Sequence, residues 1–323
     1  MKANTLFIFK LTLLILFSAM FNTAYGSTQK FPVKPIKLIV PYKAGGGVDS
    51  YARAIAAAPF FQKTQPFAVI NQAGYGGIKG TMTLRKAKPD GHTLLLVSAS
   101  SLLLSSLHRK PDLDPFSSFQ VIAQVGELNT ALVVPADSPY QNTSKLVRAI
   151  QDKHSKMRWG HSGRNSFHHF SGMGFLNANH LKVRDVPFRG GGPARAALIS
   201  HQVDFGFIGV QQLKGYESLL KGLAVNAHTR DEAMSNIPTF TELGIKNFSL
   251  SSPVVLLAPK NTPKIIVNQL QQMLKQLAKV NTLKEKLANQ GLNIKYADSQ
   301  QTQFQLTELF NRITNQLNTS LSP

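Results

Sequence analysis

Three glycine-rich stretches each lie between an apolar run and a segment of helical composition. They read AGGG at 44–47, GYGG at 74–77 and RGGGP at 189–193. A helix N-terminus exposes unpaired N–H groups and a partial positive charge, so a glycine turn leading into a helix can present these donors to an anion. The stretches therefore predict anion binding, and the alternative for each is a tight turn that uses glycine for its positive φ.

The first stretch does not have the spacing of a nucleotide-binding loop. GGGVDS matches neither G-x-G-x-x-G nor G-x-x-x-x-G-K-[ST], and no lysine stands where a phosphate-binding loop needs one. The sequence therefore predicts no nucleotide and no other cofactor.

Ser162 is the one serine in a context close to that of a hydrolase nucleophile. Gly160-His161-Ser162-Gly163-Arg164 resembles the elbow G-x-S-x-G, but arginine replaces the last glycine. His169 and then Asp185 follow, whereas the elbow family places the acid before the histidine. Hydrolysis through Ser162 thus stays open as an alternative to a strand-to-helix turn that binds a solute.

The nearby histidines do not form a convincing metal-binding motif. The chain has no cysteine, and the carboxylates nearest to His161, His168 and His169 are Asp152 and Asp185. Adjacent histidines on a helix also point in different directions. We expect no metal site.

Alternating strands and helices position these loops. Apolar runs and turn residues predict βα units, and hence a mostly parallel sheet, in each half of the chain. The expected strands are 34–41, 67–72, 92–100, 129–135, 157–163, 183–188, 203–209 and 223–229. The expected helices are 48–58, 78–88, 143–153, 168–180, 194–202, 265–280 and 301–317.

The N-terminus and the charge favour an exported protein that attracts anions. Lys2 and Lys10 precede an apolar run from Leu11 to Phe21. Together with small residues at 24 and 26, they predict a signal peptide over 1–26, cleaved before Ser27. Without cysteine there is no lipid anchor, so we expect a periplasmic protein. The net charge of +20 attracts anions, but the basic residues are dispersed, so no nucleic-acid binding is predicted.

Six motifs in register resemble the solute receptors of the tripartite tricarboxylate transporters, also called Bug-type receptors. In chain order they are KPIKLIVPYKAGGGVDSYAR, VINQAGYGGIKGT with PDGHTLLL, WGHSGRNSFHH, VPFRGGGPARAALISHQVDFGF, IPTFTELG and LLAPKNTP. Together they cover nearly all of the chain after the signal peptide.

The resemblance implies an α/β periplasmic binding protein with two lobes and a ligand cleft between them. Each lobe would be a mostly parallel sheet flanked by helices, with lobe 1 at 27–128 plus 249–323 and lobe 2 at 129–248. The implied function is capture of a mono-, di- or tricarboxylate, without catalysis, and delivery to membrane permease subunits. We expect a monomer, and a sensory receptor for a membrane kinase is the alternative partner relationship.

The resemblance also implies the ligand-binding residues. In the family, main-chain amides of the first two glycine loops hold one carboxylate, and the other lobe adds two loops. The predicted set is Tyr42, Lys43, Ala44, Gly45, Gly46, Gly47, Asp49, Tyr75, Gly76, Gly77, Ser98, Ser162, Gly163, Arg164, Asn165, Ser166, His169, Phe188, Arg189, Gly190 and Asp204.

Three of these residues depart from the family's usual pattern. Tyr75 stands in a loop that commonly reads GAGG, where it would crowd the pocket or stack on a ring. Arg164 and Asn165 replace smaller residues, and Arg164 adds a possible bidentate partner for a carboxylate. These departures affect the choice of solute more than the fold.

Overall fold

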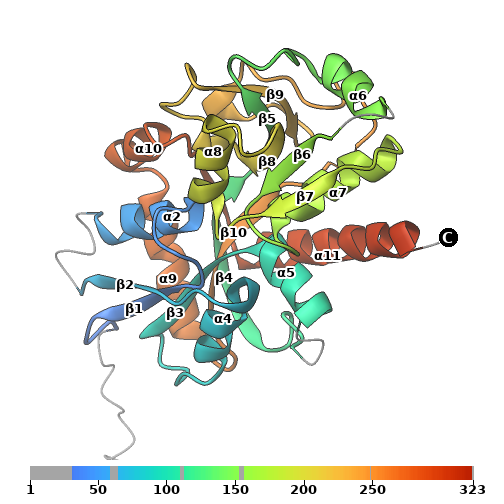
Figure 1. The fold of residues 1–323 in the computed structure, drawn as a ribbon. Coiled ribbons are helices and arrows are strands. Elements are labelled where there is room, and N and C mark those ends of the chain that lie inside the picture. The colour runs from blue at the N-terminus through green and yellow to red at the C-terminus, as the bar shows by residue number, and fades with distance from the viewer. Residues whose placement is uncertain (1–30, 59–64, 110–112, 153–155, 248, 322–323) are drawn as a thin grey trace, which may run out of the picture. The chain divides into compact units, whose positions relative to one another are not determined.

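The computed structural model describes residues 31–58, 65–109, 113–152, 156–247 and 249–321. The predicted signal peptide lies outside these ranges. Residues 34–323 form one compact unit, which contains two mixed sheets with flanking helices (Figure 1). Within the described ranges, no helix combines the length and the apolar character required to cross a membrane.

The first sheet has six strands in the order β11-β4-β10-β3-β1-β2. Strands β1 to β4 run in one direction, and β10 and β11 run in the other. The strands are β1 (Ile36–Val40), β2 (Phe67–Asn71), β3 (Thr93–Ser98), β4 (Phe119–Leu128), β10 (Ser252–Pro259) and β11 (Ile294–Ala297).

The second sheet has five strands in the order β7-β6-β8-β5-β9, and only β5 is reversed within it. Its strands are β5 (Thr130–Pro135), β6 (Arg158–His161), β7 (Arg184–Pro187), β8 (Phe205–Gly209) and β9 (Leu220–Asn226). Four of five strands in this sheet and four of six in the first share a direction. The predicted α/β class is therefore confirmed, with mixed sheets in which the strand pairs on both sides of β10 and of β5 are antiparallel.

Helices cover both faces of each sheet. On the first sheet, α4, α5 and α11 enclose one core, and α2, α9 and α10 pack together beside β4. On the second sheet, α8 packs on one face, and α6 and α7 pack on the other. The helices are α2 (Gly47–Ala56), α4 (Ile78–Arg85), α5 (Ala99–Arg109), α6 (Thr143–Gln151), α7 (Phe167–Ala178), α8 (Gly191–Ile199), α9 (Lys264–Leu277), α10 (Asn281–Ala288) and α11 (Ser299–Leu321).

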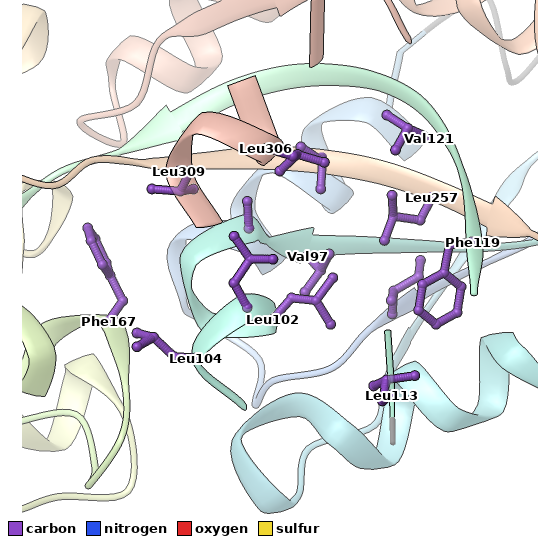
Figure 2. Close-up of a cluster of buried hydrophobic side chains, with 14 of the residues drawn as sticks. Val97, Leu102, Leu104, Leu113, Phe119, Val121, Phe167, Leu257, Leu306 and Leu309 are labelled. Carbon is purple, nitrogen blue, oxygen red and sulfur yellow. The ribbon is translucent and has the colours of Figure 1, made fainter. Parts of the chain in front are cut away.

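The core of the first sheet also contains a side chain from α7, the helix that packs on the second sheet. Phe167, the first residue of α7, is 3% exposed and belongs to the apolar cluster that contains Leu104 and Leu309. Figure 2 shows the Phe167 ring next to Leu104 of α5. Burial of an aromatic side chain contributes roughly 1.5–3 kcal/mol, so this contact fixes the start of α7 against α5.

Two crossovers bring the loop-bearing edges of the two sheets together. The first is Asn129, between Leu128 at the end of β4 and Thr130 at the start of β5. The second runs from Asn226 at the end of β9 to Ser252 at the start of β10. Thr130 pairs with Gly209 and with Asn226, and Ser252 pairs with Leu128. The carboxyl ends of β1 to β4 and of β6, β8 and β9 therefore meet at the crossovers.

Three strands of this arrangement, β4, β10 and β11, are absent from the sequence interpretation. Strands β4 and β10 pair along their full length and lie in the centre of the first sheet. They are reversed relative to each other, so the βα pattern that predicts parallel strands does not detect them. The expected strand at 92–100 also ends early, at Ser98, because α5 begins at Ala99.

Candidate functional site

The first glycine loop, residues 41–47, is held from beneath by Asp49. The Gly45 N–H and the Asn71 amide each donate to the Asp49 carboxylate at 2.9 Å, and Arg53 Nε also donates at 2.9 Å. Asn71 also donates to the Tyr42 carbonyl at 3.1 Å. Asp49 is 2% exposed and both of its oxygens are engaged, so it positions the loop and does not face a ligand.

Above Asp49, the loop leaves its helix end open. The N-cap residue Gly46 provides no side-chain cap for α2, so the first N–H groups of the helix point beyond its end. Lys43, Ala44 and Gly45 are exposed, and Gly45 has a φ of +84°. This arrangement can bind an anion through main-chain amides.

The second glycine loop lies directly beside the first. A Cβ at Gly77 would lie 3.4 Å from the Tyr42 ring, and Ser105 of α5 donates to the Gly76 carbonyl at 2.9 Å. Residues 74–77 all have positive φ, including Tyr75 at +50°. Tyr75 is 76% exposed, and its backbone adopts a conformation that favours glycine.

Ser98 is the link between these loops and the second crossover. Its Oγ lies 2.7 Å from the Oγ of Ser252 and 3.0 Å from that of Ser101. The Tyr42 hydroxyl is buried beside Ser98 and Ser101, and burial raises the pKa of Tyr42 to about 12. Ser98 is 4% exposed, so its hydroxyl belongs to this buried network.

The third loop, residues 162–166, is shaped by caps and histidine contacts. Ser166 caps α7 by accepting from the His169 N–H at 3.2 Å, and Asn165 has a φ of +60°. The Ser162 Oγ lies 2.6 Å from His168 Nδ1. Burial lowers the pKa of His168 to about 4, so this histidine is a weak base and the pair is poorly suited to activating Ser162.

Behind this loop, His161 lies within hydrogen-bonding distance of Asp185, and the His169 ring lies beside the His161 ring with centroids 4.5 Å apart. The potential ligand atoms of these three residues lie within 4.8 Å of one another. Each histidine Nδ1 accepts a main-chain N–H, His161 from Gly163 at 3.2 Å and His169 from Asn165 at 3.3 Å. With Nδ1 accepting, a neutral imidazole carries its proton on Nε2, so His161 can donate from Nε2 to Asp185.

Asp185 joins this group to Arg164. It lies 3.2 Å from His161 Nε2 and accepts from Arg164 Nη2 at 3.0 Å. Burial raises the pKa of Asp185, but the His161 hydrogen bond and the Arg164 charge lower it further, so it ends below its usual value. Arg164, predicted as a partner for the ligand, thus has one nitrogen engaged with Asp185.

The fourth turn, residues 188–190, contacts the third loop. The Phe188 N–H donates to the His161 carbonyl at 2.9 Å, and a Cβ at Gly163 would lie 3.4 Å from the Phe188 carbonyl. Gly190 precedes α8 without a side-chain cap. Arg189 is exposed, so this turn presents a guanidinium beside an open helix end.

Asp204 is the predicted site residue that the fold places elsewhere. Its carboxylate accepts from the Arg158 N–H at 2.7 Å, at the amino end of β8. The loops described above follow the carboxyl ends of the strands. The five residues of β8, at about 3.3 Å each, separate Asp204 from that edge.

Sequence reasoning also missed two residues at this edge, Gln211 and Gln212. They form the 3-10 turn Val210–Gln212 directly after β8. Gln212 accepts from Arg195 at 3.2 Å, and Arg195 stacks on the Tyr216 ring with 3.9 Å to its centroid. The sequence signal that could have found them is their position directly after a buried strand, because ligand sites of parallel sheets lie at the carboxyl ends of the strands.

The family comparison agrees with this architecture. The family model described as "Tripartite tricarboxylate transporter family receptor" matches residues 51–318. The chain belongs to this family. Receptors of the family are periplasmic binding proteins and not enzymes, so this receptor binds a solute and does not hydrolyse an ester through Ser162.

Individual relatives are distant but cover most of the chain. The "UPF0065 protein in tcbD-tcbE intergenic region" of Pseudomonas sp. (strain P51) is 28% identical over 84% of the receptor and 82% of its own length. The periplasmic binding protein BugD superposes with a TM-score of 0.81 at 25% identity, covering 90% of the receptor and 98% of BugD. MatC from Rhodopseudomonas palustris, solved with bound malate, has a TM-score of 0.80 at 25% identity, covering 88% and 99%.

Proposed function

We propose that the receptor captures an organic anion, a mono-, di- or tricarboxylate, at the edge where its two sheets meet. The observation that carries this proposal is the set of open helix ends there. Helices α2 and α8 each begin after a glycine that provides no side-chain cap, whereas the first N–H groups of α4 donate to carbonyls of the second glycine loop. Such open ends bind carboxylates through main-chain N–H groups and the helix dipole.

The second support is the chemistry of the relatives. MatC, at 25% identity, holds malate, and the family is described as tricarboxylate receptors. A micromolar dissociation constant corresponds to about −8 kcal/mol. Hydrogen bonds to a charged group contribute roughly 1.5–3 kcal/mol each. A few main-chain amides and one guanidinium would therefore supply most of this binding free energy.

The proposal extends to motion and to the partner. Residues 27–128 with 249–323 would move as one lobe and 129–248 as the other, because each set carries its own sheet and two crossovers connect them. Closure around the ligand would then present the receptor, as a monomer, to permease subunits of a tripartite transporter, the partner that the family description names.

Trp159 makes a direct binding test possible. It is the single tryptophan of the chain, and its ring stacks on His169 with centroids 5.8 Å apart. Protein refolded to remove retained ligand is titrated with carboxylic acids, neutral sugars and amino acids while tryptophan fluorescence is followed, with calorimetry as a second readout. We expect saturable binding of at least one carboxylate. Binding of a neutral sugar, with no response to any acid, would overturn the proposal.

A further inference from the structure

The turn Val210–Gln212 is fixed by contacts with the crossover residue Asn129 and with Gly291. The Val210 N–H donates to the carbonyl of the crossover residue Asn129 at 2.9 Å. On the other side, a Cβ at Gly291 would lie 3.0 Å from Gln211 Cα and 3.1 Å from Lys214 Cβ. Gly291 follows α10, which packs beside the first sheet, and has a φ of +70°. The backbone at Gln211 is therefore held in place.

The side chain of Gln211 lies between two glycines, Gly47 of α2 and Gly209 of β8. A Cβ at Gly47 would lie 2.9 Å from Gln211 Nε2 and 2.7 Å from Leu128. A Cβ at Gly209 would overlap the same amide. Gly47 is the first residue of α2, so the amide reaches the helix end at which we propose that the anion binds.

This amide differs from that of its neighbour. Gln212 is 6% exposed and accepts from Arg195. Gln211 is half-buried, and no described residue forms a hydrogen bond with its side chain. A half-buried amide without a protein partner, next to open main-chain donors, is available to a ligand.

We propose that Gln211 is a ligand-contacting residue that sets specificity, donating from Nε2 to an oxygen of the anion held at the end of α2. This inference rests on the proposed function. A neutral amide favours an oxygen-bearing anion through hydrogen bonding without adding charge. The same carboxylate is then contacted from both sheets, so its binding favours their approach.

The test uses the refolded protein and the carboxylate that binds it most tightly in the fluorescence titration. Gln211→Met keeps the length and removes the donor, and Gln211→Glu places a negative charge there. Gln202→Met is the matched control, because Gln202 is exposed beyond the opposite end of β8. Calorimetry gives the dissociation constant, and urea unfolding without ligand shows whether each variant is intact.

We expect roughly a ten- to hundredfold weaker affinity for Gln211→Met, the usual effect of losing a hydrogen bond to a charged group. Gln211→Glu should weaken binding further, and Gln202→Met should not change it. Unfolding midpoints without ligand should be the same for all three. Wild-type affinity in Gln211→Met and Gln211→Glu would overturn this inference and leave the proposed function standing. If the wild-type protein binds no carboxylate, both this inference and the proposed function are overturned.

Discussion

Asp49 carries a negative charge directly beneath a loop that we propose binds anions. The burial of Asp49 raises its pKa, but hydrogen bonds from Arg53, Gly45 and Asn71 lower it more, so the net pKa is below its usual value. The charge is thus compensated inside the protein. Because the three donors compensate the negative charge of Asp49, its repulsion of a ligand held by the amides above it is small.

Replacing Asp49 with Asn should loosen the first glycine loop. The new amide nitrogen would face donors where the carboxylate now accepts from Gly45 and Arg53. We expect the free energy of unfolding to fall by about 1–3 kcal/mol, measured by urea denaturation, together with weaker binding of the carboxylate. Asp137→Asn, at a side chain that is 74% exposed, should change neither. An unchanged stability in Asp49→Asn would contradict the anchoring role.

His168 makes stability depend on pH. Its pKa is lowered to about 4 by burial, whereas an unfolded histidine titrates near 6.5. Between these values the unfolded state binds the extra proton, so stability is complete above about pH 6.5 and falls as the pH approaches 4. Each such histidine contributes a slope of at most about 1.4 kcal/mol per pH unit.

The expected outcome is a smaller pH dependence in His168→Gln. Unfolding free energies measured from pH 7 to pH 4.5 should fall less steeply for this variant than for wild-type protein. His161 and His169, whose pKa values are also lowered mainly by burial, keep the remaining slope. His228→Gln, at an exposed position, serves as the control. An identical slope in His168→Gln and wild-type protein would show that His168 is not held neutral.

At the scale of elements, α7 follows the third loop and packs into the hydrophobic cores of both sheets. Its first residue, Phe167, packs with α5, and further along it Phe175 and Leu176 pack with Trp159 on the second sheet. The helix approaches the sheet closely at Gly172, where a Cβ would overlap the Trp159 ring and lie 3.0 Å from that of Phe207. Glycine here is required by packing and not by φ.

Gly172→Ala should therefore destabilise the protein although alanine is the better helix former. Intrinsic propensity favours alanine by about 1 kcal/mol, but overpacking costs typically 1–3 kcal/mol, so a net loss is expected in thermal or urea unfolding. In Gly192→Ala, on α8, the new Cβ would meet no atom within 4 Å, and stability should be equal or higher. A stabilised Gly172→Ala would refute the close approach of α7.

At the scale of the whole molecule, charge governs how a ligand arrives. The net charge is +20, and such a field raises the association rate of small anions. The field is screened over about 30 Å at 10 mM salt and about 8 Å at 150 mM. Contacts within the site are screened much less than this long-range field.

Raising the salt concentration from 10 to 150 mM should therefore slow association several-fold and leave dissociation nearly unchanged. Stopped-flow fluorescence of Trp159 with the tightest-binding carboxylate gives both rates. A neutral osmolyte at equal osmolarity is the control for viscosity and hydration. A loss of affinity that arises wholly from faster dissociation would mean that salt weakens the contacts within the site and that steering is minor.

The sequence by itself determined the α/β class, the three glycine turns and the family. Apolar periodicity and turn residues are local, so they predicted β1, β2, α2 and α9 in nearly their observed positions. The family motifs are also local, and they led to the loops at 42–47, 75–77, 162–166 and 188–190.

Only the tertiary structure decided which of these residues can face a ligand. Asp49 and Ser98 carry polar groups expected at the site, but their partners Asn71 and Ser252 come from other strands. Asp204 is near the right sequence motif yet at the wrong end of β8. Gln211 has no motif, and it reaches Gly47 because the crossover at Asn129 joins two edges. Such contacts depend on long-range pairing, which a local sequence pattern does not specify.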